Sequence, residues 1–204
     1  MTDDATTAYI GGIAGLSYLP PTPFDGTCKI ENCYSYTDSA VPYSAEGSTT
    51  NCYYLSDRET EEVNGVTGKT SAQFASGEVA YLLQSGQAED GGVIPQVWGQ
   101  MLTGETPDMM PVFTSDNAKK VLKVSFMLED EQGGTYIEHA AAYANPEGTV
   151  TLPEEPISSV YDFIKWSMTN SADGTEFTAQ TLVTKDIAVY AIGQEMYGET
   201  DHEK

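Results

Sequence analysis

Cysteine is the residue type in this chain that is best suited to do chemistry. The 204 residues contain Cys28, Cys33 and Cys52, and the last two stand in the repeated triplets Asn32-Cys33-Tyr34 and Asn51-Cys52-Tyr53. Thiolates are ligands for zinc, and paired thiols form disulfides in exported proteins. A cysteine can also serve as a small apolar residue in a packed interior. These three roles imply different proteins.

The spacing favours the packing role. A zinc site could use Cys28 and Cys33, but its fourth ligand would have to be His139 or His202, both of which are distant in the sequence. A disulfide would leave one cysteine over, because the count is odd. The triplets repeat after about twenty residues, and such a period is typical of stacked coils. We therefore expect Cys33 and Cys52 to stack in a solenoid interior.

Asparagine and tyrosine accompany both of these cysteines. An Asn side chain at a turn can bond to the backbone of the neighbouring coil. Since side chains alternate along a strand, some of the nearby tyrosines are expected to face outward. An exposed tyrosine suits contacts with a protein or a sugar, although a stacking ladder of tyrosines between coils is the more frequent arrangement. The candidate ligand surface is Tyr34, Tyr36, Tyr53 and Tyr54.

No catalytic, cofactor or metal residues are predicted. The sequence has no His-Glu-x-x-His, Gly-x-Ser-x-Gly, P-loop or dinucleotide-binding pattern. His139 and Glu138 are adjacent in an expected strand and would point to opposite faces. For calcium, Glu129-Asp130-Glu131 and Glu154-Glu155 could supply oxygens, but neither has the spacing of a closed loop. We expect a protein that is not an enzyme.

Charge excludes several classes of partner. Nine Lys and Arg stand against 31 Asp and Glu, a formal net charge of −22. Nucleic acid is therefore not expected as a partner, because cations must replace counterions on phosphates. No segment is long enough to span a bilayer, so no membrane insertion is expected. The start, Met1-Thr2-Asp3-Asp4, does not resemble a signal peptide. We expect that Met1 is not the natural start of the mature chain.

The periodicity predicts short strands and one helix in the first half. Residues 1–57 read as short β-type runs between turns, and residues 58–69 as a polar turn region. Thr70 or Ser71 can cap a helix that ends at Gly86. Its apolar stripe is Phe74, Val79, Leu82 and Leu83. Trp98 is expected in the core, in a short apolar stretch.

The second half reads as a four-stranded domain. Residues 114–118 are expected to be a linker, and residues 121–126 then alternate as a half-buried strand. A turn at 129–134 leads to a returning strand, and prolines enforce an extended crossing at 150–156. Trp166 is expected in the core. The strands that follow the crossing are expected at 161–166 and 186–192.

Two families resemble these patterns. The first consists of the GLUG repeats of large bacterial surface proteins, which also occur beside the catalytic part of immunoglobulin A-cleaving metallopeptidases. Gly11–Leu16 and Ile30–Tyr34 resemble the repeats themselves. Four further stretches resemble the segment that closes such an array: Asn51–Leu55, Phe74–Leu83, Trp98–Gln100 and Pro111–Val112. This resemblance covers most of residues 9–113.

The second family is the Listeria–Bacteroides repeat, the internalin-type B repeat, which residues 121–191 resemble. Its pattern is carried by Val124–Phe126, Gly133-Gly134, Pro153–Pro156, Tyr161–Trp166, Asp173–Phe177 and Thr184–Ala191. The family implies a small β-grasp-like module. Two departures are Lys165, where a Gly is usual before Trp166, and Ile192-Gly193, where an aromatic is usual. They suggest that the last strand ends earlier or packs differently.

Together these features predict a mainly β protein with a minor helix, of the α+β class. We expect the end of a β-solenoid with its capping helix at 1–113, a linker at 114–118, a β-grasp-like repeat at 119–192 and an acidic tail at 193–204. Both resemblances imply a non-catalytic part of a larger exported polypeptide at a bacterial cell surface or cell wall. It would act as a stalk or spacer and as an adhesive for a host protein or glycan. The alternative is an accessory region that positions substrate for a large secreted peptidase or glycan hydrolase.

Overall fold

The structure is a computed structural model of the whole chain, which divides into two compact units, Met1–Lys120 and Val121–Lys204. Both units are mainly β, and the described residues include two helices, so the expectation of a mostly β fold is confirmed. The solenoid and the β-grasp-like arrangement stay predictions. The structure describes residues 16–17, 29–36, 43–44, 48–56, 62–63, 65–86, 95–130, 134–157 and 161–195.

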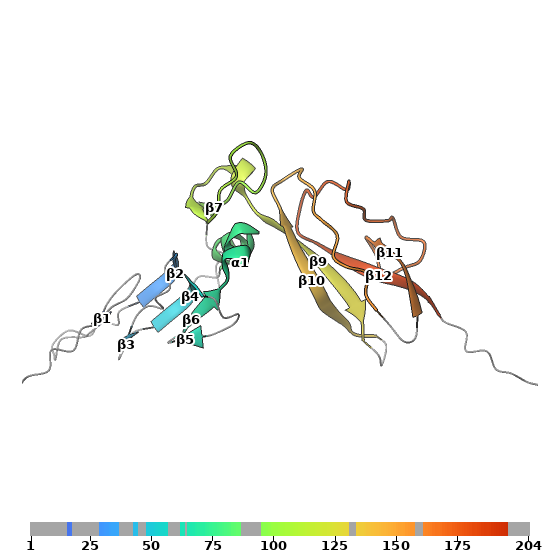
Figure 1. Cartoon of the computed structure of the whole chain (residues 1–204), viewed down its shortest axis with the longest axis horizontal. Coiled ribbons are helices and arrows are strands. Elements are labelled where there is room, and N and C mark those ends of the chain that lie inside the picture. The colour runs from blue at the N-terminus through green and yellow to red at the C-terminus, as the bar shows by residue number, and fades with distance from the viewer. Residues whose placement is uncertain are drawn as a thin grey trace, which may run out of the picture. The chain divides into compact units, whose positions relative to one another are not determined.

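Unit 1 contains a four-stranded sheet in the order β2, β4, β6 and β5 (Figure 1). The first three strands run parallel to one another, and β5 is antiparallel to β6. A separate parallel pair is formed by β1, Leu16–Ser17, and β3, Tyr43–Ser44. Successive segments of the chain thus stack beside each other, as a repeat would. The strands of the larger sheet are Lys29–Ser35, Ser48–Leu55, Val66–Lys69 and Glu62–Val63.

Two short helices follow this sheet where the sequence predicts a single one. They are α1, Ser71–Ala75, and α2, Glu78–Gln84. Thr70 caps α1 as expected, in a capping box with Gln73. The single-helix prediction is wrong because Gly77 lies between the two helices in the left-handed region, with φ 91°. Glycine tolerates this conformation, and it interrupts the helix there.

Gln100 ties α1 to the segment that follows the helices. Its side chain is fully buried, and Nε2 donates to the carbonyl oxygens of Phe74 at 2.9 Å, Ala75 at 3.3 Å and Asp108 at 3.0 Å. The first two carbonyls end α1, where few backbone donors remain; that of Phe74 also accepts from the Gly77 N–H, at 3.5 Å. Gln100 directly follows β7, Trp98–Gly99, which pairs with β8, Val112–Phe113.

The segment that was expected to be a linker is hydrogen-bonded within unit 1. Residues 117–119 form a short 3-10 helix, η1, Asn117–Lys119. The backbone N–H of Thr114 donates to the carbonyl of Val97 at 2.9 Å, and that of Gln100 to the carbonyl of Lys119 at 2.8 Å. Lys119 also pairs with Asp108 at 2.8 Å. These contacts run up to the division between the units after Lys120.

Unit 2 is a four-stranded sheet in the order β10, β9, β12 and β11 (Figure 1). The hairpin of β9 and β10 and the pair of β11 and β12 are antiparallel, whereas β9 and β12 are parallel neighbours in the centre. All four strands were expected from the sequence. Their bounds are Leu122–Glu129, Tyr136–Ala144, Tyr161–Ser167 and Ile187–Glu195.

One face of this sheet carries the core of unit 2. Along β9 the buried residues alternate with partly exposed ones, as its sequence pattern predicts. Phe126 is fully buried and packs edge-on against Trp166, with ring centroids 4.9 Å apart. The expectation that Trp166 lies in the core is therefore confirmed. The buried cluster consists of Leu122, Val124, Phe126, Ala144, Val150, Trp166, Phe177, Val183 and Val189.

The last strand does not end early, so of the two alternatives drawn from Lys165 and Ile192-Gly193 the earlier end is wrong, and the different packing stays a prediction. β12 continues to Glu195 and pairs with the start of β11. A Cβ atom added at Gly193 would lie 2.1 Å from the Tyr161 ring, so glycine leaves room for an aromatic residue from the partner strand. A register shift between Phe163 and Lys165 lies beside this contact. Of the expected acidic tail, residues 196–204 lie outside the described residues.

Candidate functional site

The two Asn-Cys-Tyr triplets lie side by side in unit 1. In the parallel pairing of β2 and β4, Cys33 is opposite Cys52 and Tyr34 is opposite Tyr53. Because side chains alternate along a strand, the cysteines and these two tyrosines belong to opposite faces of the sheet. The prediction that Cys33 and Cys52 stack is confirmed by this register.

The cysteine face is a small apolar cluster with two thiols at its centre. Cys33 Sγ and Cys52 Sγ are 3.3 Å apart, and Cys52 is buried together with Tyr54 and Val66. Both residues are free thiols. The thiol of Cys52 also lies 3.3 Å from the carbonyl oxygen of Ile30, to which it can donate. Cys28, the third cysteine, lies outside the described residues.

The hydrogen bond between the two thiols separates their pKa values. The hydrogen bond from Cys33 lowers the pKa of Cys52 to about 7, although burial acts in the opposite direction. The hydrogen bond to Cys52 raises the pKa of Cys33, and burial raises it further. One thiolate therefore forms near neutral pH, while the second proton is held tightly. The thiolate is the form that attacks a disulfide reagent, and a reagent can approach this pair from the side of Cys33, which is only partly buried.

Oxidation is therefore expected to join Cys33 to Cys52. Neighbouring strands lie about 4.8 Å apart, and this falls within the Cα separations that disulfides span. The pair would lose two protons and two electrons, which reduce one oxidised glutathione to two glutathione molecules. We expect the rate to rise as the pH increases through about 7, because the Cys52 thiolate forms in that range. Non-reducing peptide mapping after timed quenching measures the product and its rate.

The control for this experiment is Cys33→Ala, which removes the hydrogen bond that lowers the pKa of Cys52. In this variant no disulfide between strands β2 and β4 can form, and alkylation of Cys52 should require a higher pH. Formation of a disulfide that contains Cys28 in the unmodified chain would contradict the prediction. A rate that increases only in the ordinary thiol range, above about pH 8.5, would also contradict it.

The asparagines link the stacked strands to the helices, but not in the manner expected. Asn51 Nδ2 donates to Asn32 Oδ1 at 2.7 Å, so the bond between repeats joins two side chains instead of a side chain and the backbone. A second bond, at 3.2 Å, reaches the carbonyl of Leu82 in α2. Both asparagines have positive φ, 52° for Asn32 and 53° for Asn51. Asparagine tolerates this left-handed conformation better than most residues.

The candidate ligand surface of tyrosines does not form an exposed row. Tyr53 and Tyr54 are buried, at 8% and 4% exposure, and Tyr34 and Tyr36 are partly buried. Tyr53 and Tyr54 cannot therefore offer their rings to a partner in this structure. Both faces of β4 are covered, because Tyr53 packs in the cluster with Phe74 and Tyr54 packs in the cysteine cluster. A ligand surface that includes Tyr34 and Tyr36 stays a prediction.

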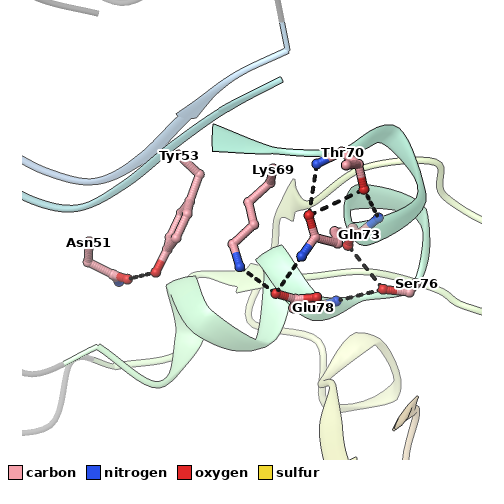
Figure 2. Close-up of polar contacts among 7 residues, drawn as sticks. All are labelled: Asn51, Tyr53, Lys69, Thr70, Gln73, Ser76 and Glu78. Atoms are coloured by element: carbon pink, nitrogen blue, oxygen red, sulfur yellow. Dashed lines mark hydrogen bonds and ion pairs between the residues drawn. The ribbon is translucent and has the colours of Figure 1, made fainter. Parts of the chain in front are cut away.

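The hydroxyl groups of these tyrosines are also engaged in the interior. Tyr34 Oη donates to the carbonyl of Pro111 at 2.7 Å. Figure 2 shows the second bond, in which Tyr53 Oη donates to Asn51 Oδ1 at 2.6 Å. Burial raises the pKa of Tyr34, and it raises that of Tyr53 to about 12, so both remain neutral donors at neutral pH. Tyr36 packs edge-on against Phe74 with ring centroids 5.1 Å apart.

A second polar cluster joins the end of β6 to both helices. Figure 2 shows the side chains of Lys69 and Gln73 converging on the carboxylate of Glu78. The backbone N–H of Glu78 donates to Ser76 Oγ at 3.4 Å, and Gln73 completes the cap with Thr70. Every charged group in this cluster has a partner of opposite charge or a hydrogen bond. The arrangement fixes the break between α1 and α2.

The remaining candidate ligands are not brought together among the residues that the structure describes. Within these residues, no group of three or more His, Cys, Asp and Glu could hold a metal ion. His139 lies at a register shift of β10, and its ring stacks on Trp166 with centroids 6.3 Å apart, whereas Glu138 pairs with Lys123 at 2.7 Å. His202 and Glu131 lie outside the described residues.

Two features of unit 1 could not be anticipated from sequence patterns. Gln100 is a fully buried polar residue, and only its position beside Phe74 and Asp108 explains why it is there. Phe113 is 78% exposed although it is aromatic, and its ring stacks on that of Trp98 with centroids 4.0 Å apart. Trp98 itself is buried, as expected, and donates to the carbonyl of Asn32 at 3.0 Å.

Comparison with known proteins finds a family model that matches one part of the chain. Residues 123–192 match the family model of the Listeria-Bacteroides repeat domain, which confirms the resemblance found in the sequence. The likeness of the first half to GLUG repeats stays a prediction. No match to a curated protein or to a solved structure was found. Unit 2 is thus similar, over residues 123–192, to the Listeria-Bacteroides repeat domain.

Proposed function

We propose that this chain is a non-catalytic module of an exported bacterial surface protein, in which it acts as a stalk or spacer. The observation that carries the proposal is the match of residues 123–192 to the Listeria-Bacteroides repeat domain, a repeat typical of surface or secreted proteins. The module is part of a larger polypeptide at the cell surface or cell wall. None of the helices described in the structure is long and apolar enough to cross a membrane.

The arrangement of unit 1 supports a spacer. In the larger sheet β2, β4 and β6 pair in parallel, and the Asn-Cys-Tyr triplet of β2 presents its Cys and Tyr side chains beside those of β4. An array of this kind lengthens by about 4.8 Å with each added strand of the sheet. The formal net charge of −22 adds self-repulsion, which keeps such a module soluble and unaggregated.

The positions of the tyrosines favour the spacer role over the adhesive role. Adhesion to a host protein or glycan was expected to use Tyr34, Tyr36, Tyr53 and Tyr54. Two of these rings are buried, and the hydroxyl groups of Tyr34 and Tyr53 bond to groups of the same unit. These contacts hold the stacked strands against the helices, and an adhesive role would have to use the partly exposed Tyr34 and Tyr36 or other residues.

The test is surface proteolysis of intact source cells, followed by mass spectrometry of the released peptides and of wall and cytosolic fractions. A protease specific for acidic residues suits this chain, since it has 31 Asp and Glu but only nine Lys and Arg. We expect peptides of both units in the released material, from a polypeptide much larger than 22.0 kDa. A cytosolic ribosomal protein must be absent from that material.

The opposite outcome would remove the proposal. A species near 22 kDa that is confined to the cytosol, with no peptide released from intact cells, would show that the protein is not a surface module. A catalytic domain on the same large polypeptide would instead support the alternative, in which this chain is an accessory region of a secreted enzyme.

A further inference from the structure

The first and last strands of unit 2 are parallel neighbours in the centre of its sheet. The pairing joins Val124 to Ile187, Ser125 to Ala188, Phe126 to Val189 and Met127 to Tyr190. Outside this central pair, β10 borders β9 and β11 borders β12 (Figure 1). The chain thus enters unit 2 along one strand of the pair and leaves the sheet along the other.

This topology determines how tension along the chain would load the unit. Because β9 and β12 point in the same direction, the start of β9 and the end of β12 lie at opposite ends of the pair. Pulling these two points apart slides one strand along the other. The hydrogen bonds lie across the strands and would all be loaded together. The strands cannot then be peeled apart one bond at a time.

Burial adds to the resistance against sliding. Val124, Phe126 and Val189 are fully buried in the core of the unit. A slip of one residue would turn every side chain of a strand to the other face, so the strands cannot move in small steps. At the entry point, the backbone N–H of Lys123 also donates to Asp186 Oδ1 at 2.9 Å, which joins the start of β9 to the residue before β12.

We propose that the β9–β12 pair is a mechanical clamp, and that unit 2 bears tension between the segments that precede and follow it. The hairpin of β9 and β10 provides the internal contrast. There Leu122 is opposite Ala144, so the start of β9 and the end of β10 lie at the same end of the pair. Tension applied between those two points would peel the hairpin open one bond at a time.

The experiment is single-molecule force spectroscopy of the full chain in two pulling directions. Handles are attached through a clickable amino acid at two exposed positions, which leaves the native cysteines unchanged. The pair Lys120 and Gln194 loads β9 against β12 in shear, whereas the pair Lys120 and Thr149 peels β10 from β9. We expect a several-fold higher unfolding force in the shear direction. Equal forces, or a lower force in shear, would overturn the proposal.

A matched pair of variants separates the clamp from general stability. Val189→Ala shortens a buried side chain within the clamp, and Val150→Ala makes the same change elsewhere in the same core. Because forced unfolding follows the unfolding rate, we expect only Val189→Ala to lower the shear force clearly, while denaturant unfolding shows similar losses for both. An equal fall in shear force for both variants would place the resistance in the core as a whole and contradict the clamp.

The inference deepens the proposed spacer role, which gives the clamp its purpose, but the two can fail separately. A high ratio of shear to peeling force in a protein found only in the cytosol would support the clamp and contradict the surface role. Equal forces in a protein released from intact cells would keep the surface role and remove the clamp.

Discussion

Phe126→Ala should destabilise unit 2 by about 3–5 kcal/mol, the range for removing a buried aromatic side chain. Phe126 is fully buried in the central strand β9, and its ring contacts those of Trp166 and Phe177 at centroid distances of 4.9 and 6.0 Å. The substitution would leave a cavity between these rings, which the sheet can close only by moving its backbone. A domain is stable by only about 5–15 kcal/mol, so much of the unit's stability would be lost.

The measurement must report on unit 2 alone, because the chain has a tryptophan in each unit. Native-state hydrogen exchange of the β9 and β12 amides, read by mass spectrometry, meets this condition. Ile157→Ala is the control, since Ile157 is fully exposed in the same unit. We expect its effect to be within about 0.5 kcal/mol. If Phe126→Ala cost no more than Ile157→Ala, the core described here would be wrong.

Gln100→Leu should destabilise unit 1 by about 3 kcal/mol, because buried acceptors that lose a donor each cost about 1–3 kcal/mol. The leucine side chain has a similar volume, so the effect comes from lost hydrogen bonds and not from a cavity. The carbonyl oxygens of Phe74 and Asp108, bonded at 2.9 and 3.0 Å, would have no donor from this residue. The end of α1 should become the first part of the unit to open.

Hydrogen exchange of the α1 and α2 amides, together with urea unfolding, measures this effect. Gln96→Leu is the matched control in the same segment: its Nε2 donates to the carbonyl of Asp116 at 3.3 Å, in a bond exposed to water. Water can replace that bond, so we expect a loss below about 0.5 kcal/mol. Equal losses in the two variants would mean that the amide of Gln100 does not hold α1 in place.

The sequence alone predicted the structure correctly where a single local pattern determines the element. Alternation along residues 121–126 predicted β9 and its buried face, and the Gly-Gly turn predicted the hairpin with β10. The repeated triplets predicted that Cys33 would stand opposite Cys52. In each case the signal is the strand period of two or the repeat period, which depends only on neighbours in the chain.

The helix shows where such local patterns become insufficient. Phe74 and Val79 are five residues apart, a spacing that a single helical face does not give. The break at Gly77 accommodates this spacing, and Glu78 is then held by Lys69 from β6. The side chain that secures the break comes from another element, so the sequence of the helix alone did not reveal it.

What the sequence determined by itself was the mainly β composition, the position of the strands of unit 2, the stacking of the cysteines and the likeness of the second half to a surface repeat. In unit 1, residues 58–69 were predicted to be a polar turn region but contain β5 and β6. Only the tertiary structure decided which polar and aromatic residues are buried. Tyr53 could have faced a partner, and Gln100 could have faced water. Their burial depends on groups 20 or more residues away, such as Phe74, and alternation along one strand carries no information about what covers each of its faces.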